Sequence, residues 1–299
     1  MWCGAEPARR HSANGGTCQN HDVSQAETTS TRGILGGDPG AKFELTRITP
    51  SEAVAEYVER HWIVRWDLAA DDCFTQELLP HPCVNLVTES SGAAVHGIPL
   101  RRSAHRLDGA GVAVGTKFRP GAFTAFAGVP PSKLVGASWR LPAVFGEDGA
   151  VLERQLTAAS PETHIARVED FLRSHMPIPN RRLERLRSVV ADMLVADRAV
   201  GVGELARRHA MSPSTLQRLF RDLVGVTPKW VLKRYRVHEA VERIASGEAP
   251  DAAGLARDLG YFDQSHFIHD FTAQVGQSPG AYARACAAVR TRRGDVVSA

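Results

Sequence analysis

The chain has 299 residues, 43% of them hydrophobic, which suffices for ordinary protein cores and favours two domains over one. No apolar run approaches the roughly 20 residues of a membrane span, and the N-terminus has no continuous apolar segment of the kind that signals secretion. The five cysteines form no C-x-x-C pair, so neither a disulfide framework nor a zinc knuckle is expected. We therefore expect a cytoplasmic protein that does not associate with a membrane.

The net charge of +3 is unevenly distributed. Residues 200–299 carry 14 Lys and Arg against 10 Asp and Glu, whereas residues 1–199 carry 22 against 23. A basic C-terminal part beside a near-neutral remainder is typical of a nucleic-acid-binding module joined to another domain. An excess of four positive charges over 100 residues is also common in proteins that do not bind nucleic acids. The charge distribution alone is therefore only weak support for nucleic-acid binding.

Residues 1–40 are rich in Gly, Ser, Thr, Asn and Gln, and we expect a disordered tail there. Four metal-ligating side chains fall in this segment: Cys3, His11, Cys18 and His21. Their irregular spacing and the lack of a scaffold argue against a metal site.

Residues 41–155 have the pattern of a β-rich domain. Short apolar runs bounded by Pro and Gly predict half-buried strands at 61–66, 83–87, 112–115 and 139–141. One short helix is expected around Ser51–Glu59, ahead of the strands.

A helical connector is expected over residues 156–180. Ser160 and Pro161 form a plausible helix start, and the helix should run to about His175. The Pro177–Asn180 segment then breaks the helix, so we place the domain boundary there. From residue 181 to about 290 the pattern is helical throughout, with a tail over residues 291–299.

One sequence pattern occurs twice in this helical region. Each copy has an L-A-R triplet followed by an F-x4-G-x2-P arrangement. The landmarks are Leu205, Phe220, Gly225 and Pro228 in the first copy, and Leu255, Phe271, Gly276 and Pro279 in the second. Each copy predicts a short helix, a tight turn, a second helix and a glycine stop, over about 202–224 and 252–275. This is the plan of a helix-turn-helix, which places its second helix in a DNA major groove.

The second helix of the first unit should begin at Ser212 and Pro213. Its apolar residues fall on one stripe, which leaves Ser214, Gln217 and Arg218 on the outer face. Arginine can bind guanine O6 and N7 and glutamine can bind adenine N6 and N7, so these side chains suit base reading.

The second unit repeats this plan, with Asp263 as the expected N-cap. Phe267 and Phe271 should face inward. The residues expected to project outward are Gln264, Ser265, Ile268 and His269. Between the units, a long helix over 228–245 carries several cations. We expect DNA phosphates to be contacted by Arg221, Lys229, Lys233 and Arg234.

These stretches, above all Leu205–Phe220 and Leu259–Phe267, resemble the DNA-binding domain of the AraC/XylS family of bacterial transcription regulators, over about residues 181–290. The resemblance implies two helix-turn-helix units in successive major grooves on one face of DNA. It also implies RNA polymerase as a partner. The family's base-contacting positions fall on Ser214, Gln217, Arg218, Gln264, Ser265, Ile268 and His269.

Two departures from the family concern the second unit. The family commonly has arginine where this chain has His269, and Gly254 lies in the first helix of the unit. Glycine costs about 1 kcal/mol in a helix interior. We therefore predict that the second unit is looser and reads bases less stringently than the first.

The N-terminal half resembles the cupin-like sensor domain of one branch of these regulators, through Leu78–Val87 and Val114–Ala122. Such a domain binds an inducer or mediates dimerisation. The side chains expected to line an effector pocket are Trp62, Trp66, Phe118, Arg119 and Trp139, with Arg119 placed to fix an anionic ligand. The alternative for each aromatic residue is a plain role in the core.

Two enzymatic alternatives are weaker. A cupin metalloenzyme would have Glu77, His81, His96 and His105 available as ligands, but there is no His-x-His pair. Cys83 follows Pro82 as in alkyl-transferring repair proteins, but no His or Arg follows it to activate a thiolate.

The sequence therefore predicts an α+β chain in which a β-rich cupin-like domain precedes an all-α double helix-turn-helix domain. The expected function is transcription regulation through double-stranded promoter or operator DNA, modulated by a small-molecule effector, with a homodimer as a further candidate assembly. We expect no enzyme activity and no cofactor. The alternatives are a cupin metalloenzyme with a regulatory DNA-binding tail, and a DNA-binding protein whose N-terminal half only dimerises.

Overall fold

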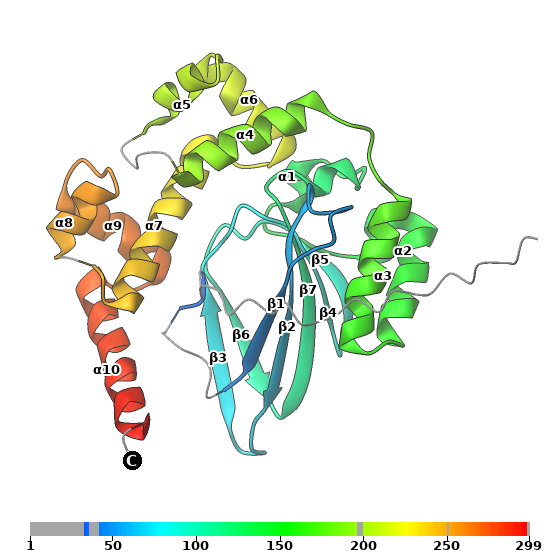
Figure 1. Cartoon of the computed structure of the whole chain (residues 1–299), viewed down its shortest axis with the longest axis horizontal. Helices are drawn as coiled ribbons and strands as arrows, with labels where there is room; N and C mark the ends of the chain where they lie inside the picture. The colour runs from blue at the N-terminus through cyan, green and yellow to red at the C-terminus, as the bar shows by residue number, and fades with distance from the viewer. Residues whose placement is uncertain (1–32, 36–41, 196–199, 250, 298–299) are drawn as a thin grey trace, which may run out of the picture.

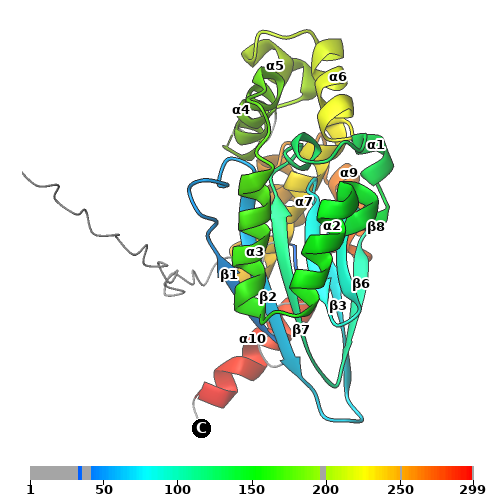
Figure 2. The same cartoon turned by 90° about the vertical axis from the view of Figure 1, so that its right-hand side faces the viewer.

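The computed structural model describes residues 33–35, 42–195, 200–249 and 251–297, and it has an α+β architecture. The strands occupy the N-terminal half, and the repeated sequence pattern lies in a region built only of helices (Figure 1). Seen from two directions, α2 (Leu141–Thr157) and α3 (Pro161–Ser174) cover one face of a sheet, while α7 (Pro228–Ser246) and α9 (Gln264–Val275) lie beyond the opposite face (Figure 2).

Six strands form the main sheet, in the order β1-β2-β7-β4-β5-β8, and every neighbouring pair is antiparallel. A second sheet pairs β3 with β6, and residues 33–35 join it through a bridge from Ile34 to Leu78. The strands are β1 Glu44–Ile48, β2 Val58–Asp67, β3 Cys73–Leu78, β4 Asn85–Glu89, β5 Gly92–His96, β6 Ser103–Asp108, β7 Ala110–Phe118 and β8 Ser138–Arg140.

The helices that follow begin earlier than the sequence pattern indicated. They are α1 Pro131–Leu134, α2 Leu141–Thr157, α3 Pro161–Ser174, α4 Arg181–Val195, α5 Val202–Arg208, α6 Pro213–Leu223, α7 Pro228–Ser246, α8 Ala252–Asp258, α9 Gln264–Val275 and α10 Pro279–Val297. A short 3-10 helix, η1, spans Phe123–Ala125. The helix expected around Ser51–Glu59 is instead a series of hydrogen-bonded turns that passes directly into β2.

Helix α3, expected as a connector, is packed on the main sheet. Its Val168, Phe171 and Leu172 share one core with Leu86 of β4 and Phe118 of β7. This apolar stripe explains the packing, because an exposed connector would leave those side chains in water. The long α10 likewise continues to Val297, so the backbone of most of the expected tail is helical.

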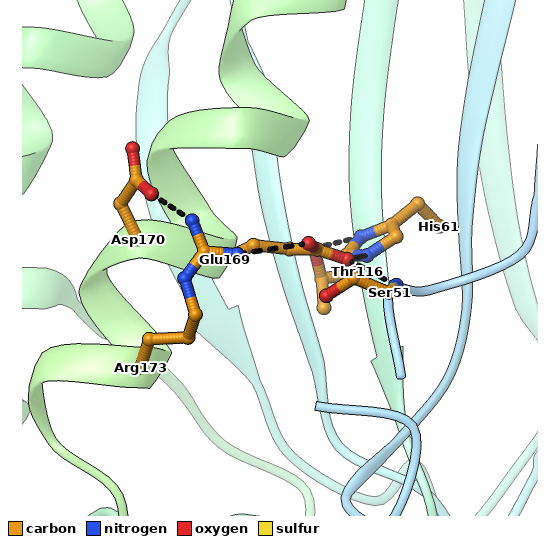
Figure 3. A network of polar contacts seen from close by, with 6 residues as sticks. All are labelled: Ser51, His61, Thr116, Glu169, Asp170 and Arg173. Atoms are coloured by element: carbon orange, nitrogen blue, oxygen red, sulfur yellow. Dashed lines mark hydrogen bonds and ion pairs between the residues drawn. The ribbon is translucent and has the colours of Figure 1, made fainter. Parts of the chain in front are cut away.

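A buried polar network fastens α3 to the sheet (Figure 3). His61 of β2 is fully buried, and its Nδ1 shares a hydrogen bond of 2.9 Å with the Thr116 hydroxyl. Its Nε2 lies 3.0 Å from Glu169 Oε1, which also accepts the Ser51 backbone N–H at 2.8 Å. Burial works to raise the pKa of Glu169, but hydrogen bonds from His61 and Ser51 outweigh it and lower that pKa to about 2. Glu169 is therefore ionised in the folded protein and joins three segments.

Candidate nucleic-acid interface

The two repeated units have the same backbone turn between their helices. In the first unit the turn residue is Ala210, with φ of +51°, and in the second it is Gly260, with φ of +67°. The amide of the following residue donates to a carbonyl in the first helix, over 2.8 Å from Met211 to Ala206 and 2.9 Å from Tyr261 to Ala256. The sequence repeat is therefore a structural repeat, with one helix-turn-helix geometry built twice.

Ala210 is strained where Gly260 is not, because a side chain makes the left-handed conformation unfavourable. We expect Ala210→Gly to raise the free energy of unfolding by about 1 kcal/mol, and the reciprocal Gly260→Ala to lower it by a similar amount. Urea denaturation of the two variants is the measurement. A stabilising Gly260→Ala would contradict the equivalence of the two turns.

The second helix of each unit, α6 in the first and α9 in the second, begins with the expected side-chain cap. We call these two helices the recognition helices. The Ser212 side chain accepts the Thr215 backbone N–H at 3.1 Å, and the Asp263 side chain accepts that of His266 at 2.7 Å. Each helix buries an apolar stripe, and the two units have separate cores. The first contains Leu205, Ala206, Leu216, Leu219 and Phe220, and the second contains Leu255, Ala256, Phe267, Phe271 and Tyr282.

Gly254 lies at the start of α8 and not in the helix interior, where we expected its cost. It lies in the first turn of α8, where its N–H donates to the Asp251 carboxylate at 2.7 Å. The N-cap of the corresponding helix, α5, is Gly201, which has no side chain to accept a hydrogen bond. Capping therefore gives the first unit no advantage, and a difference between the units rests on the side chains that each one exposes.

Six of the seven residues expected to contact bases are exposed on the recognition helices. On α6 these are Ser214, Gln217 and Arg218, and on α9 they are Gln264, Ser265 and His269. The seventh, Ile268, is partly buried against the core of the second unit. The His269 side chain is 83% exposed and lies 3.9 Å from the Asp270 carboxylate. The exposed faces of α6 and α9 therefore both offer hydrogen-bonding side chains to a partner. Among these six exposed positions the one arginine is Arg218, on α6.

The four residues expected to contact phosphates divide into two pairs. Arg221 and Lys229 are exposed. Lys233 pairs with the buried Asp270 carboxylate at 2.9 Å. Arg234 lies over the Trp230 ring, 4.5 Å from its centroid, and donates to the Leu100 carbonyl of the N-terminal domain at 2.9 Å. In this arrangement Lys233 and Arg234 make contacts within the protein instead of extending to a phosphate.

The N-terminal domain also contacts the helical region at points that the sequence did not indicate. Arg102 donates to the carbonyl of Val275, the last residue of α9, at 3.1 Å. On α7, the His238 Nε2 lies 2.9 Å from the Pro80 carbonyl, and its ring stands 4.0 Å from the His81 ring. These side chains are far apart in sequence, so only the tertiary structure reveals the junction.

A cavity of about 440 Å³ lies within the N-terminal domain, bounded by the main sheet and β3 and β6. Of the side chains expected in an effector pocket, Trp62 and Trp66 line it. Phe118 points to the opposite face, where its ring packs 5.0 Å from Phe123, and Trp139 donates to the Lys133 carbonyl at 3.2 Å. Arg119 borders a separate cleft of about 790 Å³ beside α4 and α7.

The residues considered for enzymatic roles take part in other contacts. No cluster of three or more His, Cys, Asp or Glu suited to a metal occurs in the part of the chain that the structure describes. Glu77 pairs with Arg102 at 2.9 Å, and His96 hydrogen bonds with Ser138 at 2.9 Å. Burial raises the pKa of Cys83 to about 12, so this residue is a neutral thiol. The four potential ligands of the N-terminal segment lie outside the described residues.

Two protein families match the chain. A helix-turn-helix domain family matches residues 205–285, and a domain of unknown function, DUF6597, matches residues 46–139. Within the described residues, no helix is long and apolar enough to cross a membrane.

Among curated proteins, the transcriptional activator RclR of Escherichia coli is 33% identical over 99 residues, 33% of this chain and 34% of its own. The arabinose operon regulatory protein of Escherichia coli is 29% identical over 112 residues, 38% of this chain and 37% of its own. The regulator Rv1931c of Mycobacterium tuberculosis is 35% identical over 86 residues, 29% of this chain and 33% of its own. The chain thus spans about a third of the length of these relatives, all of which are transcription regulators.

Among solved structures, the DNA-binding domain of AdpA in complex with a target DNA is 32% identical, with a TM-score of 0.32. The alignment covers 37% of this chain and 96% of that domain.

Proposed function

Because the C-terminal region of this chain belongs to the AraC/XylS family of helix-turn-helix transcription regulators, we propose that the protein regulates transcription from promoter DNA in response to a small molecule. The observation that carries the proposal is the duplicated turn, with hydrogen-bonding side chains exposed on both second helices. We propose that α6 and α9 read successive major grooves on one face of the duplex, with RNA polymerase as a further partner. Action in the cytoplasm follows from this role.

The base-reading roles follow from the chemistry of the exposed side chains. Arg218 suits guanine and Gln217 suits adenine, because each can form two hydrogen bonds to the major-groove edge of that base. Arg221 and Lys229 are exposed nearby and would neutralise phosphates without reading sequence. Gln264, Ser265 and His269 would give the second unit a weaker selectivity, since none of them has the guanidinium group of Arg218.

The effector would act through the contacts between the domains. A ligand that binds one domain arrangement better than another shifts the population between them, and DNA affinity changes with it. We propose that the Arg234–Leu100 and Arg102–Val275 hydrogen bonds, which join the N-terminal domain to α7 and α9, hold these helices in place until an effector binds. A homodimer built through the N-terminal half is compatible with this scheme.

In vitro selection of random DNA by the full-length protein tests the proposal. We expect enrichment of a bipartite sequence whose two halves lie about one helical turn apart, roughly 10–10.5 base pairs centre to centre. Arg218 should correspond to a guanine in the more strongly constrained half. A pool with no enriched sequence at moderate salt would refute the proposal that the protein recognises a DNA sequence.

Loosening the junction should make DNA binding less dependent on the effector. We expect Arg102→Ala to raise the DNA affinity measured without effector by about five- to tenfold, because one hydrogen bond should supply only the lower part of a coupling free energy of about 1–3 kcal/mol. The neighbouring Arg101→Ala, also at an exposed arginine, is the matched control and should have no effect. Fluorescence anisotropy with the selected DNA measures both, and equal affinities for the two variants would exclude a restraining role for Arg102.

A further inference from the structure

The second unit is one residue longer than the first between its turn and its recognition helix. In the first unit a single residue, Met211, separates the turn residue from the N-cap Ser212. In the second unit two residues, Tyr261 and Phe262, separate the turn residue from the N-cap Asp263. Met211 and Tyr261 are both buried, and both donate the backbone hydrogen bond that closes the turn. These two residues therefore correspond, and Phe262 is the additional one.

The Phe262 side chain is 94% exposed, although the residues on both sides of it are fixed. The Tyr261 ring belongs to the core of the second unit, where its centroid lies 5.3 Å from that of Phe267. The Asp263 carboxylate accepts the His266 backbone N–H at 2.7 Å. These contacts hold the backbone at Phe262 in place while its ring faces solvent. Since removing apolar surface from water is favourable, the ring is suited to an apolar contact in a complex.

Phe262 also lies beside the side chains that are proposed to read bases. Asp263 has an extended backbone, with φ of −149° and ψ of 169°, so its neighbours Phe262 and Gln264 point to the same side of the chain. Gln264 and Ser265 are exposed in the first turn of α9. The N-terminal residues of a recognition helix are those that contact base edges in the major groove. When α9 enters a groove, the Phe262 ring therefore enters with these residues.

The chemistry of the ring selects one kind of base contact. A phenyl ring has no hydrogen-bonding group, so it does not read the donors and acceptors of a base pair. The apolar group that a base exposes in the major groove is the C5 methyl group of thymine. Contact between the ring and this methyl group removes both from water.

We propose that Phe262 reads the methyl group of a thymine that adjoins the bases contacted by Gln264 and Ser265. The second unit then owes part of its selectivity to an apolar contact that has no counterpart in the first unit. The inference rests on the proposed function, in which α9 reads DNA, and it adds a residue and a base to that role.

Deoxyuridine tests this contact, because it lacks the methyl group of thymidine and keeps every hydrogen-bonding atom of the base. Each thymine of the selected DNA is replaced in turn, and fluorescence anisotropy measures the affinity of the full-length protein. We expect one replacement, in the half-site that does not contain the guanine read by Arg218, to weaken binding by about fourfold, the effect of one buried methyl group. Phe262→Ala should weaken binding to the thymine-containing site by about five- to tenfold and abolish the effect of that replacement.

Three controls separate this contact from a general effect on the protein. Phe262→Leu keeps an apolar side chain and should retain most of the preference for thymine over deoxyuridine. Ile178 is 89% exposed between α3 and α4, so Ile178→Ala should leave the affinity for both sites unchanged. Because the Phe262 ring lies outside the core, Phe262→Ala should shift the thermal melting temperature by less than about 2 °C.

Several results would overturn the proposal. One is equal affinity of the wild-type protein for thymine and deoxyuridine at every position, which includes a selected half-site without thymine. Another is a Phe262→Ala protein that keeps the wild-type preference. A third is a clear loss of thermal stability in Phe262→Ala, because the ring would then belong to the core. A protein that selects a DNA sequence but gives one of these results keeps the proposed function and loses this inference, whereas a pool with no enriched sequence removes both.

Discussion

Replacing Arg218 by alanine is expected to weaken binding to the selected DNA by about 1–3 kcal/mol, or roughly five- to 150-fold. The guanidinium lies on the exposed face of α6 and can donate two hydrogen bonds to one guanine, so the loss should concentrate at one base pair. Fluorescence anisotropy with the selected site and with a site changed at that guanine measures both effects. The variant should bind the two sites almost equally.

Two further variants make this result interpretable. Lys229→Ala removes an exposed cation expected to contact a phosphate, so it should weaken all sequences alike and reduce the salt dependence of binding. His269→Ala should cost less specificity than Arg218→Ala, because an imidazole cannot form the paired hydrogen bonds that a guanidinium forms with guanine. An equal or larger loss for His269→Ala would contradict the predicted inequality of the two units.

Replacing Glu169 by glutamine is expected to lower the free energy of unfolding by about 3 kcal/mol at neutral pH. The carboxylate is only 6% exposed, lies 3.0 Å from the buried His61 ring and accepts the Ser51 N–H. Removing one partner of a buried, hydrogen-bonded pair leaves the other without compensation. Urea denaturation at neutral pH measures the loss.

The same network predicts how stability changes with pH. Folding lowers the pKa of Glu169 from 4.5 to about 2, so its contribution is present above 4.5 and is lost as pH falls toward 2. The wild-type protein should lose stability over this interval more steeply than Glu169→Gln. Glu162→Gln is the control on the same helix, since that side chain is 49% exposed and should change stability by less than about 0.5 kcal/mol. Equal losses for the two variants would show that burial of Glu169 is unimportant.

The helix-turn-helix units were predictable because their signals are local. Ser212 and Asp263 are capping residues, and the spacing of Leu216, Leu219 and Phe220 fixes a buried stripe within one helix. These interactions span only a few residues, so the sequence predicted both the helices and their outward faces.

Contacts between distant segments were not predictable in this way. Arg234 is a cation on the long helix, so the sequence predicted that it contacts a phosphate. In the structure it donates to the Leu100 carbonyl instead, because the N-terminal domain lies against α7. The sequence predicted helix α3 as a connector between domains. In the structure its apolar side chains are buried against the main sheet. No periodicity in the sequence identifies which surface an amphipathic element will meet.

The cavity shows the same division. Strand alternation places Trp62 and Trp66 on one face of β2, and the same rule separates Phe118 from Lys117 on β7. The sequence does not say which face is covered by helices and which encloses a cavity, so Phe118 was expected in the pocket although it lies in the core. One sequence signal could have identified the face that encloses the cavity. Gly111 and Gly115 lie on the same face of β7, opposite Trp66 and Trp62 of β2.

The spacing of the two half-sites tests most directly that the repeat reads two successive major grooves on one face of DNA. Inserting about five base pairs between the halves of the selected sequence rotates one half to the opposite face of the duplex, whereas inserting about ten restores the face. We predict that the first insertion reduces affinity to that of a single half-site and that the second restores part of the loss. Equal affinity for all three spacings would contradict simultaneous reading by both units.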